Sequence, residues 1–126
     1  MAVCKHFPGH GDTEIDSHNA LPELNFDRAR LDSIELYPFK KAVEAGIGGV
    51  MVGHLHAPSL GDGPASISQE VIMHTLIDEL RFHGLVVTDA LEMKGIAGHD
   101  DVCARALIAG NDVVLSPRNL KKKLTV

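Results

Sequence analysis

Residues that can exchange protons are concentrated near the N-terminus of the chain. Positions 5–18 hold three histidines, two aspartates and a lysine, and Pro8, Gly9 and Gly11 interrupt them. Such a density of titratable groups on a turn-rich segment suits a loop better than a core. Catalytic side chains often lie on loops that a rigid scaffold holds in place. We therefore expect this segment, which runs KHFPGHGDT and then DSH, to form part of an active site.

Asp16 and His18 are separated by one residue, so a turn can bring their side chains together. Asp16 can then accept a hydrogen bond from one ring nitrogen of His18, which fixes the tautomer and raises the basicity of the ring. An unperturbed histidine titrates at about pH 6.5 and can act as an acid or a base near neutrality. The spacing therefore suggests a proton-transfer pair, and the alternative is two solvated loop residues.

Asp89 directly follows the apolar run at residues 85–88. Such a run predicts a buried strand, so the carboxylate is expected at the strand's C-terminal tip. Parallel α/β folds place their sites at these tips. Asp89 therefore either faces a site or caps a helix that begins near Ala90, and the spacing alone leaves both possibilities open.

A second chemistry is suggested by His54 and His56, which form an H-x-H pair after another apolar run. Together with His6, His10 and Asp12 they could ligate a divalent metal and make the protein a metal-dependent hydrolase. The competing interpretation is that these histidines pack or form hydrogen bonds within the fold. No cofactor is indicated by the sequence.

The elements that must position these residues can be predicted from the apolar pattern. Short apolar runs at 2–4, 50–52, 85–88 and 113–115 predict four strands buried on both faces. Helical patterns lie between the runs. The first starts at Pro38 and stops at Gly46, the second is capped by Ser66 or Ser68 and stops at Gly84, and the third is capped by Asp100 or Asp101 and stops at Gly110. Alternating strands and helices predict an α/β fold with a parallel sheet.

Composition excludes several classes of protein. A length of 126 residues suits one domain, and the net charge of −5 argues against a nucleic-acid partner. The apolar runs are too short for a membrane span, and no segment resembles a signal peptide. The two cysteines do not indicate a disulfide framework. The sequence does not choose between a cytoplasmic and a secreted bacterial location.

These motifs together resemble glycoside hydrolase family 3, and in particular its β-N-acetylglucosaminidases. The resemblance rests on residues 5–13 with 16–18 (KHFPGHGDT, DSH), and on the sequences LDSIELYPF at 31–39, VMV with His54, PAS at 64–66, VVTDAL at 86–91 and AGND at 109–112. It extends over nearly the whole chain, and its first motif is highly specific.

The resemblance implies a (β/α)₈ barrel and a retaining exo-β-N-acetylglucosaminidase that acts on peptidoglycan- or chitin-derived sugars. By motif position, Asp89 would be the nucleophile. His18 would be the general acid/base, with Asp16 as its partner. Lys5, His6 and His54 would bind the sugar. A histidine acid/base is compatible with retention, which needs catalytic groups on opposite faces of the sugar. It is also compatible with a phosphorolytic variant of the same fold.

The predicted strands number four, whereas a barrel of this kind has eight strands in about 250 residues. We therefore expect residues 1–126 to be a single fragment of the catalytic domain, a half-barrel of about four βα units. Its open sheet edges would favour association, either as a homodimer or with the missing N-terminal half. The fragment is expected to be inactive alone, and a further alternative is a non-catalytic half-barrel that needs complementation.

Overall fold

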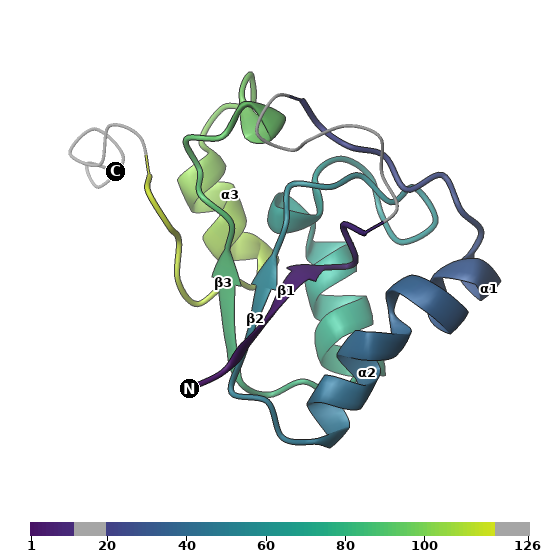
Figure 1. The fold of residues 1–126 in the computed structure, drawn as a ribbon. Coiled ribbons are helices and arrows are strands. Elements are labelled where there is room, and N and C mark those ends of the chain that lie inside the picture. The colour runs from purple at the N-terminus through teal and green to yellow at the C-terminus, as the bar shows by residue number, and fades with distance from the viewer. Residues whose placement is uncertain (12–19, 118–126) are drawn as a thin grey trace.

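The computed structural model of the chain describes residues 1–11 and 20–117. Its centre is a three-stranded parallel sheet in the order β1-β2-β3. The strands are β1 (Val3–Phe7), β2 (Gly49–Val52) and β3 (Leu85–Thr88). Their arrows point the same way, so the loops after all three strands gather at one end of the sheet (Figure 1). This arrangement confirms the predicted α/β class and is consistent with part of a (β/α)₈ barrel.

Helical segments connect and cover the strands. They are α1 (Arg28–Arg30), η1 (Leu31–Glu35), α2 (Tyr37–Glu44), η2 (Ala65–Ile67), η3 (Glu70–Glu79), η4 (Lys94–Ile96) and α3 (Val102–Ala109). Segments η1 and η3 are π-helical, whereas η2 and η4 are 3₁₀ turns. The predicted helix after Pro38 is confirmed, with proline in its first turn. Gly46, at φ +82°, follows its end.

The other two helix starts are also close to the predicted positions. The Ser68 hydroxyl accepts a hydrogen bond from the amide of Val71 near the start of η3, at 3.3 Å. Asp101 precedes α3, but its side chain makes no capping hydrogen bond, and its φ is +52°. Gly110, at φ +121°, ends α3 as expected.

The core lies on one face of the sheet. Phe7, Val50, Val52 and Val86 are buried there among residues of the helical layer. On β1, burial is incomplete because Val3 is 40% exposed and Lys5 is also exposed. The prediction of strands buried on both faces is therefore wrong for β1, because within the described residues a helical layer covers only one face.

The predicted end of the second helix is wrong. The helix η3 stops at Glu79, and Arg81 then adopts a left-handed conformation with φ +61°. Gly84 serves a different purpose, because a Cβ at this position would lie 2.5 Å from the carbonyl oxygen of Gly48. The glycine therefore allows the close approach of two backbones at the start of β3.

The predicted fourth strand at 113–115 is also wrong. This segment follows the edge of β3 but makes only an isolated bridge, between Val87 and Val113. The amide of Leu115 donates to the side-chain hydroxyl of Thr88, at 3.1 Å, instead of to a backbone carbonyl. The regular ladder therefore stops, and Val113 and Leu115 remain 38% and 37% exposed.

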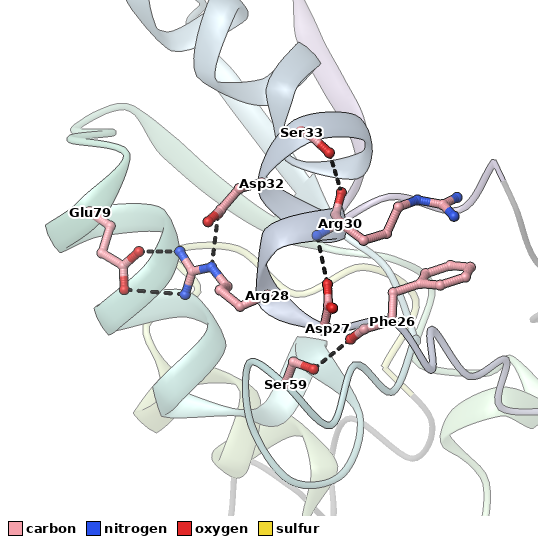
Figure 2. Close-up of polar contacts among 8 residues, drawn as sticks. All are labelled: Phe26, Asp27, Arg28, Arg30, Asp32, Ser33, Ser59 and Glu79. Atoms are coloured by element: carbon pink, nitrogen blue, oxygen red, sulfur yellow. Dashed lines mark hydrogen bonds and ion pairs between the residues drawn. The ribbon is translucent and has the colours of Figure 1, made fainter.

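Surface polar contacts tie the first helices to η3 (Figure 2). Arg28 forms ion pairs with Asp32, at 2.8 Å from its Nε, and with Glu79 on η3. The Asp27 carboxylate caps the amide of Arg30 at 2.8 Å. The Arg28 and Glu79 side chains are 38% and 48% exposed, so solvent screens their interaction and it adds little stability. No described helix is long and apolar enough to cross a membrane.

Candidate active site

Asp89 lies immediately after β3, at the end of the sheet where the three loops meet. Its amide donates to the carbonyl oxygen of Val52 at 2.9 Å, which continues the pairing of β2 and β3 by one residue. Its Oδ1 accepts a hydrogen bond from the amide of Ala90 at 2.8 Å. No described helix begins at Ala90, since the next helical turn is η4. The structure therefore excludes helix capping at Ala90 as the role of Asp89, and the site role stays a prediction.

His6 on β1 approaches the same carboxylate. Its Nε2 lies 3.7 Å from Oδ2 of Asp89, and the two side chains are 28% and 16% exposed. Gly53 packs closely against His6, because a Cβ there would lie 3.1 Å from Cβ of His6. The peptide bonds preceding His6 and Pro8 are cis. A carboxylate and an imidazole thus share a partly exposed position at the strand ends, where a small polar ligand can reach both.

His54, which follows β2 by two residues, has no exposed surface. Its Nε2 lies 2.8 Å from the carbonyl oxygen of Ala90, and its Nδ1 lies 2.7 Å from the Ser66 hydroxyl. Burial lowers the pKa of His54, while the hydrogen bond to Ala90 and the charge of Asp89 partly oppose this shift. The ring is therefore held close to Asp89 in a neutral state.

Lys5 and His10 line a cavity of about 300 Å³ between β1 and α2. Phe39 supplies part of its apolar wall, and Glu35 lies behind the glycine-rich turn. A Cβ at Gly9 would come within 2.9 Å of Cβ of Glu35, so this glycine is required for close packing. The rings of His6 and His10 are 6.0 Å apart in an edge-on arrangement. The KHFPGH segment is therefore fixed between the strand ends and the first helices.

The four histidines of the possible metal site are not brought together. His56 pairs instead with Glu23, at 3.2 Å, and this hydrogen bond lowers the pKa of the Glu23 carboxyl. Both nitrogens of His54 already have protein partners. Among the residues that the structure describes, no three histidine, cysteine, aspartate or glutamate side chains are placed to hold a metal ion.

Asp12, Asp16 and His18 lie outside the described residues. After them, the chain rejoins the strand ends through a short parallel pairing. The amide of Leu24 donates to the carbonyl of His56 at 2.8 Å, and the amide of His56 donates to the carbonyl of Pro22 at 2.9 Å. Leu24 is fully buried. The described residues that follow position 19 thus return to the C-terminal edge of the sheet.

Two residues that support this edge were not predicted as part of the site. Ser66 was considered only as a helix cap, yet its hydroxyl contacts His54. Asn111 is buried, and its Nδ2 donates to the carbonyls of Ser66 and Ala106, each at 2.8 Å. Both residues occur in stretches that carry the family resemblance, PAS and AGND, and that was the only signal in the sequence.

A three-stranded parallel sheet with helical segments between its strands places the chain in the α/β class and is consistent with part of a (β/α)₈ barrel. The model of the glycosyl hydrolase family 3 N-terminal domain matches residues 1–125. The chain therefore belongs to glycosyl hydrolase family 3.

Several named proteins are similar to this chain. A glycoside hydrolase family 3 β-N-acetylglucosaminidase from Paenibacillus sp. str. FPU-7 is 40% identical, with a TM-score of 0.90 over 97% of this chain and 24% of that protein. Zn-bound CbsA from Thermotoga neapolitana is 34% identical, with a TM-score of 0.89 over 97% of this chain and 29% of that protein. A β-hexosaminidase from Chromobacterium violaceum is 37% identical over 118 residues, which are 91% of this chain and 33% of the relative. The chain thus spans about a quarter to a third of these proteins.

Proposed function

We propose that the chain carries the nucleophile of a retaining exo-β-N-acetylglucosaminidase, and that Asp89 is this nucleophile. The observation that supports the proposal is the position of Asp89 at the tip of β3, with its carboxylate partly exposed and His6 at 3.7 Å. The names of the Paenibacillus and Chromobacterium relatives favour a terminal N-acetylglucosamine residue as the substrate. Peptidoglycan- or chitin-derived oligosaccharides would supply it.

The reaction takes place in two displacements. Asp89 attacks the anomeric carbon while the glycosidic C–O bond breaks and His18 gives a proton to the leaving oxygen. Water then loses a proton to His18, attacks the same carbon and releases Asp89. Asp16 would orient His18, and Lys5 and His6 would bind sugar hydroxyls. A histidine suits the acid/base role because its ordinary pKa, about 6.5, lies close to neutrality.

We also propose that residues 1–126 form part of a larger (β/α)₈ domain. The residues at both sides of the sheet support this, since Val3 at the β1 edge and Val113 and Leu115 beyond β3 remain partly exposed. A barrel completed by a further N-terminal half, or by a second copy, would cover them. The chain would then be inactive alone and would acquire activity on complementation.

The metal-dependent alternative has less support. Although CbsA from Thermotoga neapolitana is Zn bound, His54 and His56 of this chain are occupied by Ser66, Ala90 and Glu23. A zinc site would need ligands from beyond the described residues. Activity that persists after dialysis against a chelator would rule this alternative out.

The test is the release of chromophore from an aryl β-N-acetylglucosaminide. The purified chain is assayed alone and after mixing with the N-terminal half of the Chromobacterium relative, in wild-type and Asp89→Ala forms. We expect turnover only in the mixture and none with the variant. Assays with and without phosphate separate hydrolysis from phosphorolysis. Equal turnover by wild type and Asp89→Ala would overturn the proposal.

A further inference from the structure

His54 is a buried polar residue directly beside the proposed nucleophile. Its side chain has no exposed surface, although β2 ends in the loop region where a sugar would bind. Both ring nitrogens already have protein partners, Ser66 and Ala90. No ring nitrogen is therefore available for a sugar hydroxyl, which favours a connection within the protein over direct contact with substrate.

The partners determine the tautomer of His54. A carbonyl oxygen can only accept, so the nitrogen that lies 2.8 Å from Ala90 O, which is Nε2, must carry the proton. Nδ1 is then an acceptor, and the Ser66 hydroxyl donates to it at 2.7 Å. Burial lowers the pKa of His54 and keeps the ring neutral with one defined proton.

Ala90 connects this ring to the carboxylate of Asp89. The Ala90 amide donates to Oδ1 of Asp89 at 2.8 Å. The carbonyl of Ala90 accepts from His54 at 2.8 Å and, at the longer distance of 3.2 Å, from the amide of Met93. The Asp89 backbone is fixed independently, through its amide and the carbonyl of Val52 at 2.9 Å. With the backbone fixed, the orientation of the carboxylate depends on where the Ala90 amide points.

A buried residue beyond α3 extends the connection. Asn111 donates to the carbonyl of Ser66 at 2.8 Å, and Ser66 in turn contacts His54. Ser66 is fully buried and Asn111 is nearly so. These hydrogen bonds thus link three loops that are far apart in the sequence, in the order Asn111, Ser66, His54, Ala90 and Asp89. Among the described residues, Oδ1 of Asn111 has no hydrogen-bond partner, whereas the other polar side-chain atoms of this network are paired. Buried hydrogen-bond networks favour one arrangement of the groups that they join.

We propose that His54 is a positioning residue that holds the carboxylate of Asp89 in its reactive orientation through the backbone of Ala90. The inference rests on the proposed role of Asp89 as the nucleophile. Its orienting step, however, can be observed without turnover. Small displacements of a reacting group can lower a rate by about a hundredfold, so loss of this contact should reduce kcat far more than it changes KM.

Two variants separate the roles of the ring nitrogens. In His54→Gln, the amide nitrogen occupies roughly the place of Nε2 and can still donate to Ala90. In His54→Asn, the shorter amide reaches only the place of Nδ1, so the Ala90 carbonyl loses its His54 donor and keeps only the amide of Met93, at 3.2 Å. His83→Gln is the matched control, because His83 is exposed. The chain is labelled with ¹⁵N and ¹³C, and NMR spectra report the His54 ring nitrogens, the Ala90 amide and the Asp89 carboxyl carbon.

The proposal predicts a protonated Nε2 and an unprotonated Nδ1 in the wild-type chain. It also predicts that His54→Asn shifts the Ala90 and Asp89 signals, that His54→Gln returns them toward wild type, and that His83→Gln leaves them unchanged. A protonated Nδ1 would overturn it, as would Ala90 and Asp89 signals that both His54 variants leave unchanged. If His54→Asn fails to fold, the wild-type tautomer and the His54→Gln spectrum decide.

Kinetics with the complemented enzyme provide the second readout. His54→Asn should lower kcat about 10- to 100-fold with KM within about twofold, and His54→Gln should recover most of the loss. A rise in KM alone would assign His54 to sugar binding and would overturn the positioning role. Absence of turnover by the wild type counts against the proposed function, whereas the NMR result still decides the role of His54.

Discussion

Replacing Asn111 with alanine tests whether its buried hydrogen bonds stabilise the fold around the loops that follow the strands. Asn111 is 4% exposed, and its Nδ2 donates to the carbonyls of Ser66 and Ala106, both at 2.8 Å. The Ala106 carbonyl keeps a second donor, the Asn111 amide at 3.2 Å, which the substitution does not remove. The Ser66 carbonyl would lose its Asn111 donor.

The expected cost follows from these contacts. Two lost hydrogen bonds contribute about 1 kcal/mol each, and an unsatisfied buried acceptor adds about 1–3 kcal/mol. The variant should therefore be about 3–5 kcal/mol less stable than the wild type. For a chain of this length, such a loss lowers Tm by roughly 10–25 °C, since 1 kcal/mol corresponds to about 3–5 °C.

The measurement is urea unfolding at 25 °C followed by circular dichroism, because the chain has no tryptophan and one tyrosine. Asn25→Ala is the matched control, since Asn25 is exposed. It should change stability by less than about 0.5 kcal/mol. A loss below 1 kcal/mol for Asn111→Ala, with an unchanged slope, would show that the network does not stabilise this end of the fold.

Three further predictions concern pH, packing and the surface. Burial lowers the pKa of His54, so below about pH 6.5 the unfolded chain binds a proton at this residue more readily than the folded chain does. The free energy of unfolding should therefore fall as the pH drops below about 6.5. A flatter Tm profile between pH 5 and 7.5 for His54→Gln would support this origin, and an identical profile would refute it. Gly84→Ala should cost about 1–3 kcal/mol because its Cβ would meet Gly48, whereas Gly11→Ala, with open space around it, should be nearly neutral. Arg28→Ala should cost less than about 1 kcal/mol in urea unfolding, and this cost should shrink further in high salt; a larger cost would mean that its exposed ion pairs are not screened.

Local signals allowed much of the fold to be predicted. Pro38 and Gly46 bracket α2, and Gly110 ends α3, because both residue types act through their own backbone conformation. Gly84 was misinterpreted as a helix stop because its clash partner, Gly48, is distant in sequence. The segment at 113–115 has a strand-like composition, but the amide of Leu115 donates to the side-chain hydroxyl of Thr88 and the regular ladder stops there.

The candidate site was predictable only in part, because some of its contacts join residues that are distant in the sequence. Asp89 could be placed at a strand tip because the apolar run before it is local. The contact between His6 and Asp89 depends on the register of three strands, and the link from Asn111 through Ser66 to His54 depends on tertiary packing. Spacing along the chain carries no information about such contacts. His54 could therefore be predicted as a site residue, but its hydrogen-bond partners could not.

The most direct test of the account is to trap the covalent intermediate. The complemented enzyme is treated with an activated, fluorinated N-acetylglucosaminide whose glycosyl-enzyme hydrolyses slowly, and the modified residue is located by peptide mass spectrometry. We expect one sugar per chain, attached covalently to Asp89, and no attached sugar in Asp89→Ala. A label on another residue, or an unlabelled chain in a mixture that turns over substrate, would contradict the assignment of Asp89 as the nucleophile.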